Sequence, residues 1–411
     1  MTQGRFAKGV DRRAVLALAG AAPLTSACGE KENANTPHIA VIGAGIVGAS
    51  IAYHLAKSGA QVTVLERGEI AGRASHGTFA WINATWAKQP RHYHRLNQLG
   101  LARWQELESE LNIPIKWNGS VEWFADSARQ ERLVRDIAEQ VEWGEPARMV
   151  TGAGMQELEP EVAFGETPSI AFSPTDGALD PVLAAQMLID AARELGAAVE
   201  TKCEVKAVRG ETVLETSKGD IEVDRFVLAT GADPKATMAL AQLELPQRST
   251  PGVIVVTKPQ TPLLNRILVA PGVHIHQRLD GRVVLGEQDG APDTQAHAER
   301  LKDRPTRFPS EEFANQHAQR IIDVAERYLP GIKDAEIEEV VIGWRPLPLD
   351  GHPVLGPSPA QPNAYIAITH SGVTLAPIIG KLAAQELLEG IALDTLTHYR
   401  ADRRFEEVKR Y

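Results

Sequence analysis

The chain has 411 residues, of which 43% are hydrophobic and 23% charged, a composition typical of a globular protein of about two to three domains and unlike that of disordered or fibrous proteins. Its 43 basic and 53 acidic residues give a net charge of −10, which argues against the basic surface that nucleic-acid binding requires. Only two cysteines are present, Cys28 and Cys203, too few for a disulfide framework and too isolated for a zinc site.

The first 37 residues have the parts of an export signal. Arg12 and Arg13 precede an apolar stretch, 14–24, and small residues then lead to Cys28. The paired arginines resemble a twin-arginine signal, and the segment ending at Cys28 resembles the lipobox of bacterial lipoproteins. We therefore expect a periplasmic protein, or one that Cys28 anchors to the outer face of the inner membrane through a polar tether. The alternative is a cytoplasmic protein whose N-terminal arm is not processed.

A dinucleotide-binding unit is predicted directly after this segment. Its parts follow the order strand, glycine turn, helix, strand and acid, at 38–42, 43–48, 46–58, 61–65 and Glu66. Gly43, Gly45 and Gly48 match the pattern G-x-G-x-x-G, in which the first glycine permits a tight turn and the second lets a pyrophosphate approach the backbone. The third glycine lets the helix and strand pack closely, and the helix N-terminus faces the phosphate charge. Glu66 lies where a carboxylate accepts hydrogen bonds from ribose hydroxyls.

Three further segments narrow the class of dinucleotide enzyme. A small, polar loop spans 71–80, and a buried strand with a tight turn spans 226–232. The segment 343–356 contains Gly-Trp-Arg-Pro and Asp-Gly-His-Pro, and a strand at 365–369 leads into a helix that ends at Leu388. In this order the segments resemble the D-amino-acid oxidase superfamily of FAD-dependent amine oxidoreductases, especially its glycine oxidase and sarcosine oxidase branch. The resemblance covers about residues 38–390.

The resemblance implies an α/β fold in which a Rossmann-like FAD-binding domain is interleaved with an antiparallel-sheet substrate domain. The FAD-binding domain is expected at 38–90, 150–235 and 335–395, the substrate domain at 91–149 and 236–334, and a charged C-terminal tail at 396–411. Within these ranges the sequence predicts a helix from Pro181 to Gly196, a strand from Val199 to Val208, and a hairpin from Gly272 to Gly286.

The cofactor that the resemblance implies is FAD. The residues expected to bind it are Gly43, Gly45, Ile46, Val47, Gly48, Glu66, Arg67, Ser75, Val205, Thr230, Gly231, Gly372, Val373, Thr374 and Leu375. The last four begin a helix, whose positive end would face the negative charge of the reduced flavin ring. The alternatives are that Ser371 or Thr374 merely caps this helix, and that Val205 is an ordinary strand residue.

Three residues are expected to act on the substrate. In the glycine oxidase branch the arginine that matches Arg345 binds the substrate carboxylate, which a guanidinium does through two parallel hydrogen bonds. His274 lies where related enzymes place an aromatic residue on the sheet above the substrate, and it shares one strand face with His276. His370 replaces a second carboxylate-binding arginine, which leaves the substrate class open. The alternatives are a surface ion pair for Arg345 and a solvent-facing pair for the two histidines.

The expected function is oxidation of an amine or amino acid, with hydride transfer from the carbon next to nitrogen to flavin N5 and an imine as product. No second dinucleotide motif follows the first, so oxygen or a quinone is the expected electron acceptor. One alternative substrate is a 2-hydroxy acid or another alcohol. The other alternative is a non-catalytic lipoprotein that binds FAD only for its structure.

Overall fold

The structure is a computed structural model of the chain. The residues that it describes are 36–84, 88–167, 169–287 and 302–408. The predicted export signal, with Arg12, Arg13 and Cys28, lies outside them. Among the residues described, no helix is both long and apolar enough to cross a membrane.

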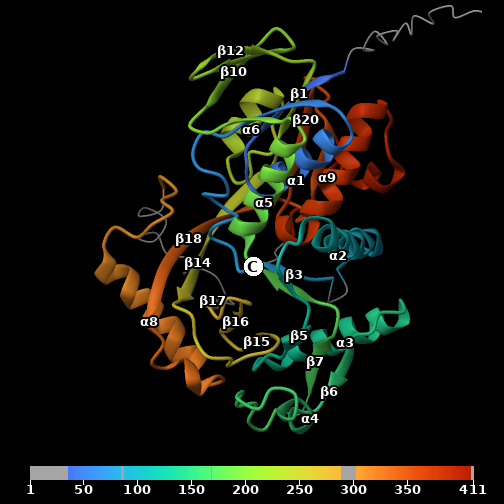
Figure 1. Cartoon of the computed structure of the whole chain (residues 1–411). Helices are drawn as coiled ribbons and strands as arrows, with labels where there is room; N and C mark the ends of the chain where they lie inside the picture. The colour runs from blue at the N-terminus through green and yellow to red at the C-terminus, as the bar shows by residue number, and fades with distance from the viewer. Residues whose placement is uncertain (1–35, 85–87, 168, 288–301, 409–411) are drawn as a thin grey trace, which may run out of the picture. The chain divides into compact units, whose positions relative to one another are not determined.

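A six-stranded sheet contains the predicted dinucleotide unit (Figure 1). Strand β1 (His38–Ile42) pairs in parallel with β2 (Gln61–Leu65) and with β13 (Arg225–Leu228). The remaining strands are β9 (Ala198–Glu200), β20 (Ala364–Ile368) and the antiparallel β19 (Val354–Pro357), in the order β19-β20-β13-β1-β2-β9. Residues 39–42 of β1 are all buried, as expected for a parallel sheet that is covered on both faces.

Helices cover one face of this sheet, and a helix with a small sheet covers the other. Side chains on alternate positions of β1, Ile39 and Val41, share a core with the first group, which comprises α1 (Ile46–Lys57), α5 (Pro181–Glu194), α9 (Gly372–Glu389) and α2 (Arg91–Leu111). Ala40 and Ile42 share a core with the second group, α6 (Pro234–Ala241) and the sheet β10 (Val205–Arg209), β11 (Val213–Thr216) and β12 (Gly219–Glu222).

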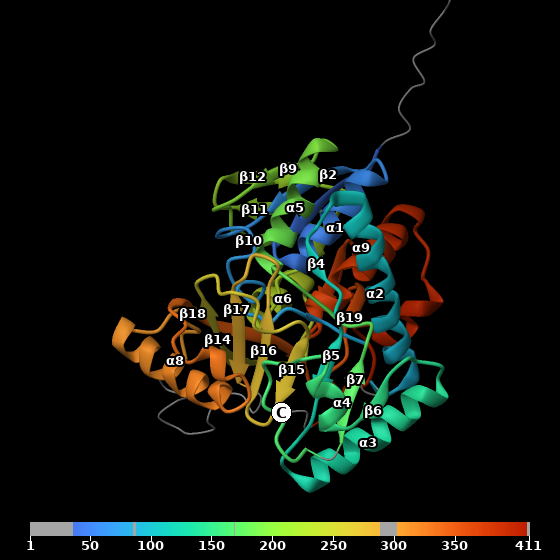
Figure 2. The ribbon, with the colours of Figure 1, turned by 60° about the horizontal axis from the view of Figure 1, so that its bottom comes forward.

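An eight-stranded, mainly antiparallel sheet forms the second layer (Figure 2). Its order is β18 (Ile337–Pro348), β14 (Gln247–Thr257), β17 (Val283–Glu287), β16 (Val273–Gln277), β15 (Ile267–Ala270), β5 (Ser120–Glu122), β7 (Ile170–Ser173) and β6 (Arg148–Val150). Helix α8 (Glu311–Glu326) packs on one face. The predicted hairpin is present as β16 and β17, and the α/β fold class is confirmed.

Short elements complete the described chain. A three-stranded sheet has the order β3 (Trp81–Ile82), β8 (Gly177–Leu179) and β4 (Ile115–Lys116). The remaining helical elements are α3 (Ser127–Glu142), α4 (Gly152–Gln156), η1 (Pro330–Ile332) and η2 (Asp394–Tyr399). Within the expected C-terminal tail, Leu396 and Tyr399 are buried in the core that α1, α2, α5 and α9 share with Ile39 and Val41.

One predicted element is wrong. The expected strand from Val199 to Val208 is two strands, β9 and β10, that lie in different sheets. Lys202 between them has a φ of 51°, in the left-handed region, so the chain turns there and cannot continue as a strand. The apolar pattern indicated β-structure correctly, but it contained no glycine or proline to mark the break.

The predicted domain boundaries stay a prediction. Strands β7 and β18 fall in ranges that the sequence assigned to the FAD-binding domain, yet both pair in the eight-stranded sheet. Helix α2 falls in a range assigned to the substrate domain, yet it packs on α9 beside the six-stranded sheet. The two sheets therefore exchange segments more often than the predicted ranges suggest.

Candidate active site

A cavity of about 440 Å³ lies between the carboxyl ends of β1 and β2 and the eight-stranded sheet. Predicted site residues that line it are Gly43, Gly45, Ile46, Val47, Glu66, Arg67, Ser75, Val205, Thr230, Gly231, His274, Arg345, His370, Gly372, Val373 and Thr374. Gly48 and Leu375 are the two predicted residues outside the lining. The structure thus gathers residues from across the sequence around one space, while the role of each stays a prediction.

The glycine turn is built by close backbone contacts. Gly43 has a φ of 106°, and a Cβ there would lie 2.5 Å from the carbonyl oxygen of Ala229. A Cβ on Gly48 would lie 1.9 Å from the carbonyl oxygen of Gly43, so any side chain would push α1 away from the turn. Gly48 therefore serves the packing of helix and strand, as the motif predicted, and its position outside the cavity lining agrees with that role.

Gly45 is the residue of the turn that keeps the cavity open. A Cβ on Gly45 would have Ser75 Oγ, at 3.3 Å, as its one neighbour within 4 Å. Ser75 Oγ accepts a hydrogen bond of 2.9 Å from the N–H of Ile46, the first residue of α1. The N-cap residue Gly45 has no side chain, the first turn of α1 carries no acidic side chain, and Ile46 and Val47 line the cavity, so the positive end of the helix faces the cavity. These features fit the pyrophosphate of a dinucleotide.

Glu66 is fixed at the end of β2. Its carboxylate accepts hydrogen bonds from the N–H groups of Ala44 (2.8 Å) and Gly68 (2.7 Å). A carboxylate has room for further donors beyond these two, so Glu66 fits an acceptor for ribose hydroxyls. The residues around the cavity therefore fit FAD at both its phosphates and its ribose.

Arg67 is held beside the turn that follows β13. Its Nη1 lies 2.6 Å from Oδ2 of Asp233, which also caps α6 through the N–H of Ala236. Burial alone would raise the pKa of Asp233, but the hydrogen bonds from Ala236 and Arg67 outweigh it and lower the pKa. The ion pair fixes the backbone on which Thr230 and Gly231 face the cavity.

The start of α9 faces the cavity without a side-chain cap. Ser371 Oγ lies 2.9 Å from Tyr93 Oη, and Thr374 Oγ1 accepts a 3.1 Å hydrogen bond from the N–H of Asn83. Neither hydroxyl therefore caps the helix, which removes the alternative that these residues serve only as caps. Leu375 is fully buried and its N–H donates to the carbonyl of Ser371, so its backbone is already bonded within the helix.

Arg345 lies on the face of the eight-stranded sheet that lines the cavity. It is opposite Thr250 in β14, and its Nη2 donates a 2.9 Å hydrogen bond to the carbonyl of Pro251. A Cβ on Gly252 would lie 3.6 Å from both Nε and Nη2, so the guanidinium lies over a position that has no side chain. The arginine is therefore part of the cavity wall.

The two strand histidines share a face, as predicted, and they contact the ring of Phe79 at centroid distances of 5.4 Å for His274 and 4.8 Å for His276. His274 lines the cavity. His276 does not, and its Nε2 lies 2.8 Å from the carbonyl oxygen of Phe79. Burial, with a smaller effect of Arg278, lowers the pKa of His276 to about 3, so it is neutral and donates this hydrogen bond.

Sequence reasoning missed several residues of the cavity wall. They include Phe79, Trp81, Asn83, Lys88 and Arg304. Lys88 Nζ donates to the carbonyl of Asn83 (3.0 Å) and to Oδ1 of Asn97 (3.1 Å), and Arg304 Nη1 donates to the carbonyl of Ala232 (2.7 Å). Phe79 and Trp81 were visible as large aromatics that end a loop of small residues. Nothing in the sequence distinguished Lys88 or Arg304 from surface cations.

Comparisons with known proteins agree with this geometry. The profile of the DAO family, described as FAD dependent oxidoreductase, matches residues 38–386. One of the opine oxidase subunits of Agrobacterium tumefaciens (strain Ach5) is 26% identical over 379 residues, which are 88% of this chain and 96% of that protein. Glycine oxidase of Bacillus licheniformis is 26% identical over 380 residues, 89% of this chain and 96% of that protein. The crystal structure of glycine oxidase from Geobacillus kaustophilus has a TM-score of 0.79 at 24% identity, covering 90% of this chain and 100% of that chain.

Proposed function

Because the chain belongs to the DAO family of FAD-dependent oxidoreductases and is therefore an FAD-dependent enzyme, we propose that it oxidises an amine or amino acid at the carbon bonded to nitrogen. The observation that carries this proposal is the position of Arg345. It lies in the same cavity as Gly45, Glu66 and the start of α9, the groups that fit the cofactor. An arginine there is suited to a substrate that carries a carboxylate.

The residues of the chain supply position and charge. Arg345 holds the carboxylate through its guanidinium fork and so fixes which carbon faces the cofactor. The uncapped start of α9 offers N–H groups and a positive helix end to an anionic ring edge. Bound FAD supplies the acceptor for the hydride and its electron pair. The substrate leaves as an imine, which water then hydrolyses, and oxygen or a quinone takes the electrons from the enzyme.

His274 and His370 both line the cavity, and each is a further candidate for substrate contact. An imidazole there can bind a carboxylate when it is protonated, or hold a proton that the amine releases. A third histidine, His76, lies between Ser75 and Gly77 in the chain but does not line the cavity. Its Nε2 is 2.9 Å from Oε2 of Glu339, and this hydrogen bond raises the pKa of His76.

A second substrate class is a 2-hydroxy acid, which fits the same carboxylate anchor, or another alcohol. Purified holoprotein mixed anaerobically with amines, amino acids and hydroxy acids separates the two, because a substrate reduces the flavin and bleaches its absorbance. We expect bleaching by amino acids or amines only. Bleaching by hydroxy acids alone would replace the proposal with the second class. Reoxidation by air or by a soluble quinone then identifies the acceptor.

We also propose export to the periplasm, supported by the sequence of residues 1–37 alone. The twin-arginine route carries folded proteins, which suits an enzyme whose cofactor contacts segments that are far apart in the chain. Fractionation of cells that express the native chain, an Arg12→Lys/Arg13→Lys variant and a Cys28→Ala variant tests it. We expect the native chain at the membrane, the first variant in the cytoplasm, and the second exported but soluble. A full-length native protein in the cytoplasm would contradict the proposal.

A further inference from the structure

The cavity wall contains an apolar surface that the proposed reaction does not use. Register in the eight-stranded sheet places Ile254 of β14 opposite Gly286 of β17, and Gly286 opposite His274 of β16. These strands are neighbours in the order β14-β17-β16 (Figure 2). Residues directly opposite each other project from the same face of a sheet. Ile254, Gly286 and His274 therefore form one row, and all three line the cavity.

Phe79 lies on this row. A Cβ on Gly286 would lie 3.7 Å from Cδ2 of Phe79, so the ring occupies the space that a side chain at 286 would fill. The ring of His274 is 5.4 Å away, and the carbonyl of Phe79 is held by buried His276. The aromatic ring is thus fixed both through its backbone and through its neighbours.

The backbone next to Phe79 is specialised. Ala80 has a φ of 61° although it is buried and is not a glycine, a strained conformation that concentrates at functional sites. The turn at Ala80 leaves both Phe79 and Trp81 on the cavity. The indole N–H of Trp81 donates a 2.9 Å hydrogen bond to Asp176, which is fully buried. Two aromatic side chains are thus held in fixed orientations at one wall.

This wall lies within the reach of a small amino acid that is bound to Arg345. The guanidinium lies over Gly252 and Phe79 lies over Gly286. Gly252 lies two residues before Ile254 in β14, and Ile254 is opposite Gly286 in the neighbouring strand β17. The Cα atoms of the two glycines are therefore about 8 Å apart. One molecule can therefore place its carboxylate on Arg345 and a short substituent on Phe79.

We propose that Phe79, with Ile254, His274 and Trp81, forms a subsite for an apolar substituent on the substrate's nitrogen or Cα. This inference rests on the proposed oxidation of an amino acid and narrows its substrate class. Glycine, which has no such substituent, leaves the subsite empty and is a poor substrate. An alkyl group on nitrogen or on Cα fills the same surface, and the two arms of the experiment distinguish them.

The test compares substrates that differ by single methylene groups. The first arm is glycine, N-methylglycine and N-ethylglycine, and the second arm is both enantiomers of alanine and 2-aminobutanoate. Burial of each added carbon should raise kcat/KM about fourfold along one arm. The same holoprotein is titrated with acetate, propanoate and butanoate, and binding is read from the perturbed flavin spectrum. Affinity should rise along this series without any turnover.

Two variants and a control locate the effect. Phe79→Ala should reduce the gain per methylene to less than about twofold, and Phe79→Leu, which keeps a large apolar side chain in place, guards against a failure to fold. Phe172→Leu is the matched control, because Phe172 is buried in the same sheet but away from the cavity lining. The control should keep the wild-type gain.

The outcomes separate the two proposals. Glycine as the best substrate, or an unchanged gain per methylene in both Phe79 variants, overturns the subsite while the oxidation of amino acids stands. If no amino acid bleaches the flavin, the proposed reaction is overturned. If the affinity for carboxylates nevertheless rises with their chain length and depends on Phe79, the subsite is supported. Flat responses in both experiments overturn both.

Discussion

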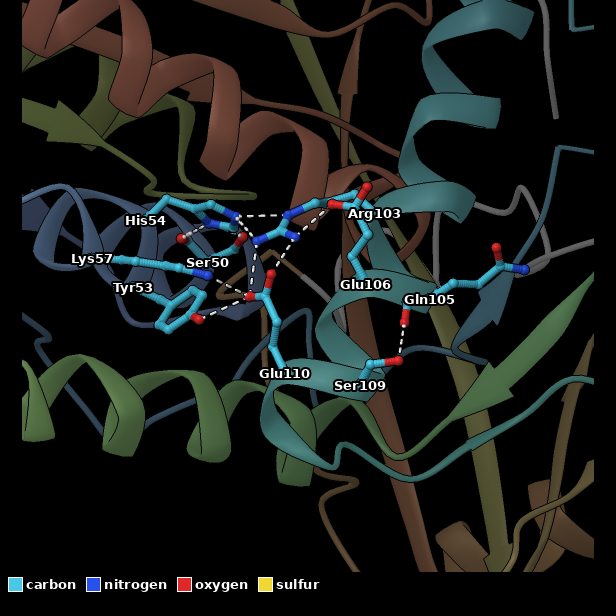
Figure 3. Close-up of polar contacts among 9 residues, drawn as sticks. All are labelled: Ser50, Tyr53, His54, Lys57, Arg103, Gln105, Glu106, Ser109 and Glu110. Carbon is cyan, nitrogen blue, oxygen red and sulfur yellow. Dashed lines mark hydrogen bonds and ion pairs between the residues drawn. The ribbon is translucent and has the colours of Figure 1, made fainter. Parts of the chain in front are cut away.

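The two ends of helix α1 meet two groups of polar residues that are built differently. At its start, Ile46 and Val47 line the cavity, and Ser75, which also lines it, accepts a hydrogen bond from the N–H of Ile46. Its second half contributes to the α1–α2 polar cluster, shown in Figure 3, whose members are Ser50, Tyr53, His54, Lys57, Arg103, Glu106 and Glu110. The first group surrounds a space, whereas in the second group the charged side chains meet one another.

Within the α1–α2 polar cluster the charges are paired. Arg103, whose side chain is 8% exposed, donates from Nη1 to Glu110 at 2.9 Å and to Glu106 at 2.6 Å. Lys57 lies 2.7 Å from Glu110. The hydrogen bond from Arg103 is the largest effect on Glu110 and lowers its pKa to about 2. Gly380 of α9 packs against the same group, because a Cβ there would lie 2.3 Å from Ser50 Oγ.

The comparison separates polar groups that stabilise the fold from polar groups that are available to a ligand. The cluster satisfies its donors and acceptors internally, so changes in it should reduce stability and leave flavin binding intact. The helix starts and Arg345 border the cavity, so changes there should affect the cofactor or the substrate and leave stability largely intact. Four experiments test this division.

The largest effect is expected at Gly45. Gly45→Val would place a branched side chain at the glycine turn, where a pyrophosphate would approach the backbone. The Cβ of the valine would lie 3.3 Å from Ser75 Oγ. We expect purified protein without flavin, measured by absorbance after release of the cofactor. Thermal unfolding compared with wild-type apoprotein should show little change. Full flavin occupancy in the variant would show that the pyrophosphate does not bind at this turn.

The next largest effect is expected at Arg103. Arg103→Met removes the hydrogen bonds of a buried guanidinium to Glu110, whose carboxylate is 31% exposed and keeps Lys57 as a donor, so the free energy of unfolding should fall by about 1.5–3 kcal/mol. Denaturant unfolding of the holoprotein measures it, and flavin should remain bound. Glu106→Gln is the control, because its side chain is 54% exposed and its pair with Arg103 should contribute about 1 kcal/mol or less. Equal losses in the two variants would contradict the paired cluster.

The contrast also explains what the sequence could predict. The sequence predicted Gly43, Gly45, Gly48 and Glu66 because the roles expected of them depend on spacing within one short unit. Arg345 was found through the resemblance of its segment to a family. The subsite at Phe79 depends on register between β14, β17 and β16, and no local pattern records that register.

The α1–α2 polar cluster was missed for a related reason. Arg103, Glu106 and Glu110 have the spacing of one helix face, which by itself is typical of a solvated surface. Only the packing of α1 and α2 buries Arg103 and brings its guanidinium against His54. The break at Lys202 was missed because the preference for a turn there comes from pairing of β9 and β10 in different sheets.

The third effect concerns Arg345. Arg345→Lys replaces a planar fork by a point charge, so one of the two hydrogen bonds to a substrate carboxylate should be lost. A charged hydrogen bond contributes about 1.5–3 kcal/mol, so kcat/KM should fall about ten- to a hundredfold while flavin stays bound. Arg282→Lys is the control, since Arg282 pairs with Glu338 outside the cavity lining. Unchanged kinetics with every carboxylate substrate would make Arg345 structural.

The smallest effect is a pH dependence of stability that originates in the cluster. His54 Nδ1 lies 2.7 Å from the carbonyl oxygen of Ser50, and Nε2 faces the Arg103 guanidinium at 3.1–3.2 Å. The neutral ring with its proton on Nδ1 satisfies both contacts. Burial is the largest cause, and with Arg103 it lowers the pKa of His54 from 6.5 to about 4.

Because the folded pKa of His54 lies below the unfolded value, the unfolded chain takes up a proton first as the pH falls. Stability is therefore lost progressively from about pH 6.5 down to about pH 4. The share of His54 between pH 7 and 5.5 is about 1 kcal/mol. His276 and His92, whose pKa values burial lowers to about 3 and about 4, add losses in the same direction. His54→Gln should therefore flatten the dependence without removing it. Denaturant unfolding of both proteins across this pH range measures the difference, and identical slopes would show that His54 has the same pKa in the folded and the unfolded chain.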